Sequence, residues 1–162
     1  MHEIIGPAIE ELCVAFERGG YNPTPIIDLG VLVANADGVV DEAERELLLD
    51  VFQTLLETKL TRDVVDAMVT ASVAVIQAAG AEPRERLVAA ILDDCGAAEA
   101  GLRVALAIAF SSDGLSDKER AVIDGIARAA HVPKETVDRL VKEVGAFAAE
   151  GGPTSTRMSL TG

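Results

Sequence analysis

The sequence has few aromatic side chains and little positive charge. Phe, Tyr and Trp make up 3% of the 162 residues, and Trp is absent. Small and straight-chain apolar residues dominate instead, which suits closely packed helices. The 27 acidic residues outnumber the 14 basic ones, giving a net charge of -13. Such a surface repels phosphate backbones, which excludes nucleic acid as a partner and favours cations or a basic protein surface.

The sequence is also poor in cysteine and in long apolar runs. Cys13 and Cys95 lie far apart and form no CxxC pair, so we interpret both as reduced, packed thiols of a cytoplasmic protein. The opening residues lack the basic start and apolar core of a signal peptide. No apolar run reaches the roughly 18 residues that a membrane span needs. We therefore expect no membrane insertion, although a membrane-associated protein partner is compatible with this pattern.

Helical periodicity covers almost the whole chain, and no segment shows the alternation of a strand. The pattern predicts an all-α, single-domain bundle of about seven or eight helices over residues 1–150. Thr61 is expected to cap a helix, Pro83 to open one and Gly96 to end it. Two helices, around residues 25–36 and 101–110, are apolar on most sides and are therefore expected at the centre. Residues 151–162 have the composition of a flexible tail.

Part of the sequence occurs twice. When residues 26–37 are aligned with 102–113, Asp37-Gly38 falls on Asp113-Gly114. After a one-residue deletion, Glu44-Arg45 falls on Glu119-Arg120. Each half, about 25–57 and 101–130, reads as an apolar helix, an Asp-Gly turn and an amphipathic helix. The sequence thus predicts two pseudo-symmetric αα-hairpins whose turns lie near each other.

The first turn resembles an incomplete EF-hand loop. Asn35, Asp37, Gly38 and Glu44 occupy loop positions 3, 5, 6 and 12. Position 1, however, is apolar in both copies, and the second loop is one residue too short. Loss of the first ligand in both halves argues against a functional EF-hand.

Helix capping explains much of the motif. Asp41 with Glu44, and Ser116 with Glu119, have the spacing of a capping box. Capping does not explain Asp37 and Asp113, whose carboxylates would face the negative end of a helix dipole. Two acidic turns brought together by pseudo-symmetry would form an oxygen-rich site for calcium, magnesium or manganese. Both interpretations, structural caps and a cation site, are compatible with the sequence.

Motifs for catalysis are missing from the sequence. It contains no GxSxG, P-loop, HExxH or dinucleotide fingerprint. His131 precedes the proline expected to open the last helix, which favours a loop or capping role. Asp93-Asp94 beside Cys95 is typical of a solvated helix end. We expect no catalytic residues and no enzymatic activity.

The duplicated motif resembles the TerB-like domains of tellurite-resistance proteins. The resemblance rests on "ANADGVVDEAERELL" and its second copy, and extends over roughly residues 25–144. It implies an all-α bundle with pseudo-twofold halves, of a kind found in bacterial stress-response systems and in a membrane-anchored DnaJ-like co-chaperone. The metal role proposed for the family's acidic motif residues would transfer to Asp37, Glu44, Asp113 and Glu119. The shortened second turn departs from the family pattern.

Two functions follow as expectations. The first is a non-enzymatic, cytoplasmic module that mediates protein interactions in a stress or tellurite-resistance system, with a divalent cation bridging the two turns. The second is an acidic scaffold that docks a basic partner without metal, its turns serving only as caps. The sequence does not specify the partner, the ion or the oligomeric state.

Overall fold

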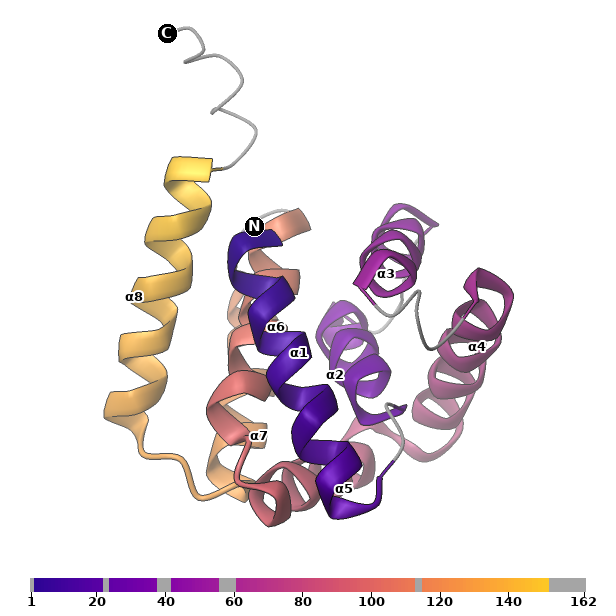
Figure 1. Cartoon of the computed structure of the whole chain (residues 1–162), viewed down its shortest axis with the longest axis horizontal. Coiled ribbons are helices and arrows are strands. Elements are labelled where there is room, and N and C mark those ends of the chain that lie inside the picture. Colours follow the sequence, from indigo (N-terminus) through magenta and orange to yellow (C-terminus); the bar gives the residue numbers. More distant parts are fainter. Residues whose placement is uncertain (1, 22–23, 38–41, 56–60, 113–114, 152–162) are drawn as a thin grey trace, which may run out of the picture.

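The computed structural model describes residues 2–21, 24–37, 42–55, 61–112 and 115–151. The elements in this part of the chain are all helical, which confirms the predicted all-α class (Figure 1). In chain order they are α1 (His2–Gly19), α2 (Thr24–Ala34), the 3₁₀ helix η1 (Asn35–Asp37), α3 (Glu42–Leu55), α4 (Arg62–Ala79), α5 (Ala81–Cys95), α6 (Ala98–Ser112), α7 (Asp117–Ala129) and α8 (Lys134–Gly151). The predicted flexible tail lies outside the described residues, apart from Gly151 at the end of α8.

The two apolar helices lie at the centre, as predicted. Every residue of α2 from Pro25 to Ala34 is buried, and α6 is buried from Val104 to Ala109. The two helices pack against each other, and α1 covers α6 while α5 covers α2. Burial of these apolar surfaces is the main favourable term in forming the bundle.

The remaining helices extend the bundle on two sides. α3 and α4 pack against α2, and α7 and α8 pack against α6. As a result α4 and α8 lie at opposite edges of the molecule (Figure 1). This arrangement is compatible with two similar halves. The pseudo-symmetric repeat itself stays a prediction.

Two arginines tie the outer helices to their neighbours. Arg45 of α3 donates to Asp66 Oδ1 of α4 at 2.6 Å and also bonds the Thr70 hydroxyl. Arg120 of α7 donates to Asp138 Oδ1 of α8 at 2.7 Å. The alignment of the two halves places Arg45 and Arg120 at equivalent positions. Each arginine binds an aspartate on the next helix in the chain.

Several helix ends are set by the residues that the sequence indicated. Thr61 caps α4 by accepting a hydrogen bond from the Val64 amide at 3.3 Å. Gly96 ends α5 in the left-handed region, at φ 65°, where glycine is favoured because it has no Cβ. α5 begins at Ala81, two residues before Pro83, so Pro83 is the third helical residue rather than the first.

Candidate functional site

The first Asp-Gly turn follows directly on the buried helix α2. η1 continues α2 from Asn35 to Asp37. The Asn35 Oδ1 atom is buried and has no hydrogen-bond partner. The side chains of Asp37 and Glu44, and the whole of Gly38 and Asp41, lie outside the described residues, so the predicted Asp41–Glu44 box stays a prediction. An unpaired buried carbonyl oxygen is costly, by about 1–3 kcal/mol, unless a donor or a cation satisfies it.

The second Asp-Gly turn connects α6, which ends at Ser112, to α7, which begins at Asp117. Asp113 lies outside the described residues, whereas Glu119 is in the first turn of α7 and is 7% exposed. The Ser116 amide donates to Glu119 Oε1 at 2.9 Å, and the Glu119 amide donates to Ser116 Oγ at 3.1 Å. These reciprocal bonds confirm the predicted capping box. Glu119 therefore has a structural role in capping α7, independent of any cation binding.

The 3₁₀ helix η1, which precedes the first Asp-Gly turn, lies against the second half of the molecule. η1 packs against α7, the helix that carries Glu119. The structure thus brings the element containing Asn35 and Asp37 beside the helix that follows the second turn. Of the four predicted carboxylates, only that of Glu119 belongs to the described side chains, so their relative arrangement stays a prediction. Within the described part of the chain, no three His, Cys, Asp or Glu side chains cluster as metal ligands.

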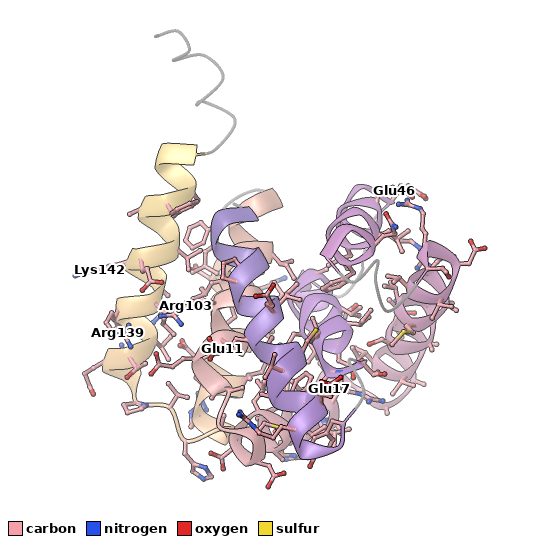
Figure 2. The ribbon with its side chains drawn as sticks, viewed as in Figure 1. Glu11, Glu17, Glu46, Arg103, Arg139 and Lys142 are labelled. Carbon is pink, nitrogen blue, oxygen red and sulfur yellow. The ribbon has the colours of Figure 1, made fainter. Side chains whose placement is uncertain are left out.

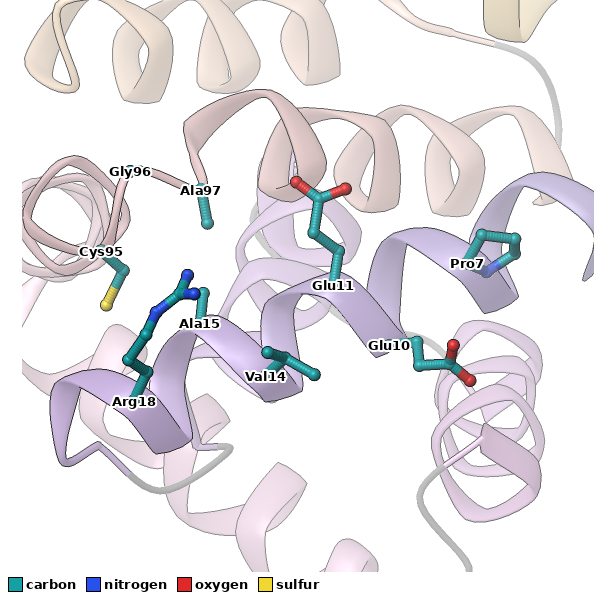
Figure 3. A pocket seen from close by; sticks show the side chains of 9 residues that line it. All are labelled: Pro7, Glu10, Glu11, Val14, Ala15, Arg18, Cys95, Gly96 and Ala97. Carbon is teal, nitrogen blue, oxygen red and sulfur yellow. The ribbon is translucent and has the colours of Figure 1, made fainter.

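A groove of about 390 Å³ lies between α1 and the link that joins α5 to α6. Figure 3 shows Arg18 extending from α1 toward Cys95 and the Gly96–Ala97 link, with Glu11 pointing toward α6. The Cys95 thiol lines this groove together with the carboxylates of Glu10 and Glu11. Burial and the neighbouring Asp94 raise the pKa of Cys95, although Arg18 opposes the shift. The sulfur is therefore a neutral thiol at pH 7, and only the thiolate is a strong nucleophile.

The acidic end of α5 forms contacts with neighbouring loops. Asp94 Oδ2 accepts a hydrogen bond from the Tyr21 hydroxyl at 3.0 Å, and this bond raises the pKa of Tyr21. Asp93 Oδ2 lies 3.3 Å from His131 Nδ1. His131 follows α7 in the left-handed region, at φ 64°, and so ends the helix, in agreement with the predicted loop or capping role. Asp93 and Asp94 are exposed, as expected of a solvated helix end.

One buried polar residue, Asp28, was not identified from the sequence. Asp28 in α2 is 4% exposed, and its Oδ1 accepts a hydrogen bond from Ser72 Oγ at 2.6 Å. Its Oδ2 pairs with Arg84 Nη1 at 3.4 Å. The carboxylate thus joins α2 to α4 and α5. The signal in the sequence was a single acid within an otherwise apolar helix.

The fold is a helical bundle, and an Asp-Gly pair of the sequence follows each of its two central helices, α2 and α6. The family model described as "Tellurite resistance protein TerB" matches residues 24–142, which include both turns. The chain belongs to the TerB family. No curated protein and no solved structure matches it. Among the described residues, no helix is both long and apolar enough to span a membrane.

Proposed function

We propose that this chain is a non-enzymatic, cytoplasmic module of a bacterial stress or tellurite-resistance system. It mediates interactions with other proteins, one class of which is membrane-associated, and binds a divalent cation at its two Asp-Gly turns. The observation that carries this proposal is the TerB match over residues 24–142. The match supports a tellurite-resistance-type module, and the cation and the partner are our extension of it.

The unpaired oxygen of Asn35 supports a cation at the turns. It is an amide carbonyl, buried, without a donor, and two residues before Asp37 in η1. Carbonyl and carboxylate oxygens are the ligands that calcium, magnesium and manganese prefer. The residues present therefore fit such an ion. Asn35 would join Asp37, Glu44, Asp113 and Glu119 in holding it, and the ion would neutralise carboxylates from both halves and fix their relative position.

Two observations support a binding role rather than catalysis. The Cys95 thiol in the groove has a raised pKa, so it is not activated as a nucleophile. The net charge of -13 favours association with a basic protein surface.

A second candidate function is a metal-free acidic scaffold. The capping box of Ser116 and Glu119 favours it, because helix capping alone accounts for the burial and bonding of Glu119. In this case Asp37→Asn with Asp113→Asn leaves partner binding intact and changes stability little.

Titration of chelator-treated protein with calcium, magnesium and manganese tests the cation claim. We expect binding heat with at least one ion, and a higher melting temperature at saturating ion. At an ion concentration of about 100 Kd the added stability is about 2.7 kcal/mol. The Asp37→Asn, Asp113→Asn variant loses both signals, whereas the control Asp63→Asn, Glu135→Gln, which removes two exposed charges elsewhere, keeps them. If the unmodified chain shows neither binding heat nor a shift in melting temperature, the cation claim is rejected and the metal-free scaffold remains.

A further inference from the structure

The groove beside Cys95 carries opposite charges toward its two ends. One wall is the link from Cys95 to Ala97. The other wall is a single stripe of α1, with residues spaced three and four apart: Pro7, Glu10, Glu11, Val14, Ala15 and Arg18. The acidic residues come first along α1 and the arginine comes last. The groove of about 390 Å³ therefore has a negative end and a positive end (Figure 3).

Arg18, at the positive end, lacks the partner that most arginines of this chain have. Arg45, Arg103 and Arg120 each donate to a carboxylate on another helix. Arg18 is exposed, and it pairs with no carboxylate in the part of the chain that the structure describes. This is unusual in a chain whose 27 acidic residues outnumber its 14 basic ones. Its guanidinium group is available to a carboxylate from outside, which it can bind through two parallel hydrogen bonds.

The same end of the groove adjoins the N-terminus of α6. Ala97 comes directly before this 15-residue helix, and its carbonyl oxygen accepts a hydrogen bond from the Gly101 amide at 3.0 Å. Ala97 thus holds the N-cap position, where alanine offers no side-chain oxygen to the first amides of the helix. The positive end of the helix dipole adds to the charge of Arg18. Both features favour an anionic group at this end.

Beyond Arg18 the two walls of the groove approach each other closely. A Cβ on Gly19 would lie 3.2 Å from Cys95 Sγ, so the last turn of α1 packs against the end of α5. The Tyr21 hydroxyl then donates to Asp94 at 3.0 Å. An extended chain lying along α1 would meet these contacts after Arg18. This favours a ligand that ends beside Arg18, as the C-terminus of a peptide does.

The middle of the groove is apolar and has the length of a short peptide. Val14 is 55% exposed, more than any other large hydrophobic side chain in the described part of the chain. Ala15 and Ala97 line the groove beside it. Arg18 is seven residues beyond Glu11, or about 10 Å along the helix axis. Three residues of an extended peptide span about the same 10 Å.

The negative end of the groove favours a basic side chain. Glu10 and Glu11 are exposed, and neither forms an ion pair with the residues that the structure describes. Arg103 of α6 acts on Glu11 electrostatically, but its guanidinium group donates to Glu143 at 2.9 Å (Figure 2). Two neighbouring carboxylates repel each other, so a cation placed near both is stabilised.

We propose that this groove binds the C-terminus of a partner protein. The terminal carboxylate pairs with Arg18 beside the start of α6, and the last apolar side chain lies on Val14. A Lys or Arg two or three residues earlier pairs with Glu10 and Glu11. This inference rests on the proposed interaction function, and it adds the location of the site and the chemistry of the segment that binds there.

A pair of peptides tests the proposal by fluorescence anisotropy. Both have the sequence Ser-Lys-Lys-Ala-Leu with a label at the N-terminus, one with a free C-terminal carboxylate and one with a C-terminal amide. We expect a dissociation constant in the micromolar range for the free acid, and about tenfold weaker binding of the amide. The amide is the more positive peptide, so unspecific attraction to a chain of net charge -13 would favour it instead. The sign of the difference therefore identifies recognition of the carboxylate.

Two arginine variants locate the positive end of the site. Arg18→Gln and Arg128→Gln both change the net charge from -13 to -14, and Arg128 is exposed on α7 and does not line this groove. We expect Arg18→Gln to weaken binding of the free acid by about tenfold and to leave binding of the amide unchanged. Arg128→Gln should leave both unchanged. Circular dichroism melts confirm that the variants fold.

Two double variants locate the negative end. Glu10→Gln with Glu11→Gln, and Asp63→Asn with Glu135→Gln, both give a net charge of -11, from -13 plus two. All four residues are exposed. The first variant should weaken binding of both peptides, because both carry the Lys residues, whereas the second should have little effect.

Cys95 provides a second readout of the same site. A peptide bound in the groove should slow the alkylation of Cys95 by iodoacetamide, whereas Cys13, which does not line the groove, should keep its rate. Mass spectrometry of the digested protein measures both rates. Equal protection of the two cysteines, or no protection at saturating peptide, would contradict binding in this groove.

Two further results would overturn the proposal. They are binding of the amide that equals or exceeds that of the free acid, and equal effects of Arg18→Gln and Arg128→Gln. Equal binding of a peptide lengthened by Ser-Ser after Leu would also overturn it, because the groove would then not require a chain end there. In each of these cases association with basic segments stands and only the groove is rejected. If none of the peptides binds, association with basic partners is rejected as well, and the cation titration still tests the two turns separately.

Discussion

At the scale of single residues, the buried carboxylate of Asp28 is stabilised by two polar partners. Asp28 lies within the most apolar helix, but the Ser72 hydroxyl and the Arg84 guanidinium satisfy its two oxygens. These partners are 44 and 56 residues away in the sequence. Local periodicity predicts that α2 is buried, but it cannot predict bonds that depend on how distant helices pack. The orphaned Oδ1 of Asn35 was unpredictable for the same reason.

The close approach of α2 and α3 leads to a prediction at Gly30. A Cβ there would lie 2.7 Å from Phe52 Cζ and 2.9 Å from Leu48 Cδ2, so Gly30→Ala forces the core to shift. We expect a loss of about 1–3 kcal/mol from overpacking, which lowers the melting temperature by roughly 2–4 °C per kcal/mol. Gly125→Ala in α7 is the control, because its new Cβ meets only the carboxylate end of Glu85. Equal melting temperatures for the two variants would contradict the tight contact.

Asp138 provides a prediction about pH. The hydrogen bond from Arg120 lowers the pKa of Asp138 below its ordinary value of 3.8, and Lys134 adds to this shift. Because the folded pKa is depressed, the ion pair contributes its stability above pH 3.8 and loses it as the pH falls through the folded pKa. Arg120→Gln should raise the pKa of Asp138 toward 3.8, and Lys134→Gln should raise it less. A carboxyl titration followed by NMR measures both, and a larger shift for Lys134→Gln would contradict the assignment.

At the scale of helices and turns, local sequence signals made several helix ends predictable. Thr61, Gly96, Ser116 and His131 all act where the sequence placed them. The start of α5 differs because Gly80, at φ 90°, serves as the C-cap of α4 and the N-cap of α5 at once. No separate loop is needed, so the helix begins before its proline. Proline is tolerated there, because the first amides of a helix have no intrahelical partner.

At the candidate cation site, local sequence allows only the capping roles to be inferred. A capping box is written in four consecutive residues, so the roles of Ser116 and Glu119 could be inferred from sequence. Convergence of Asp37 and Asp113 depends instead on how two halves pack. The sequence indicated that the turns meet, and the contact between η1 and α7 shows only how their elements lie.

Variants of the capping box at α7 can separate helix capping from ion binding. Ser116→Ala removes the acceptor of the Glu119 amide and should cost about 0.5–2 kcal/mol. Glu119→Gln keeps an oxygen that can accept from the Ser116 amide, so its loss of stability should be smaller. If Glu119 also binds a cation, Glu119→Gln weakens the ion response while Ser116→Ala leaves it largely intact. Urea unfolding and ion titration of both variants measure this, and an equal ion response in both would confine Glu119 to capping.

At the scale of the whole molecule, local ion pairs stabilise the fold, whereas repulsion among the excess negative charges destabilises it. Arg103 donates to Glu143 at 2.9 Å and Arg139 donates to Glu99 at 3.1 Å, both between α6 and α8 (Figure 2). Exposed pairs of this kind contribute little individually. The net charge of -13 acts over the entire surface.

We therefore expect added salt to stabilise the protein. Raising NaCl from ~10 mM to ~150 mM shortens the screening length from ~30 Å to ~8 Å, which weakens repulsion across the surface more than the short ion pairs. The melting temperature should rise. A variant with Glu10→Gln, Asp63→Asn and Glu135→Gln has a net charge of -10, from -13 plus three, and should rise less. A fall in melting temperature with salt would mean that the ion pairs outweigh the repulsion.

The packing of α1 has a consequence for synthesis of the chain. Leu12 and Phe16 of α1 are fully buried or nearly so, and α1 packs against α6. Ala98, where α6 begins, is 79 residues beyond Gly19, where α1 ends. At roughly 5–20 residues per second, the ribosome needs about 4–16 s to make that interval. During this time α1 lacks α6, the main helix against which it packs, so the apolar face of α1 is open to chaperones or to proteolysis.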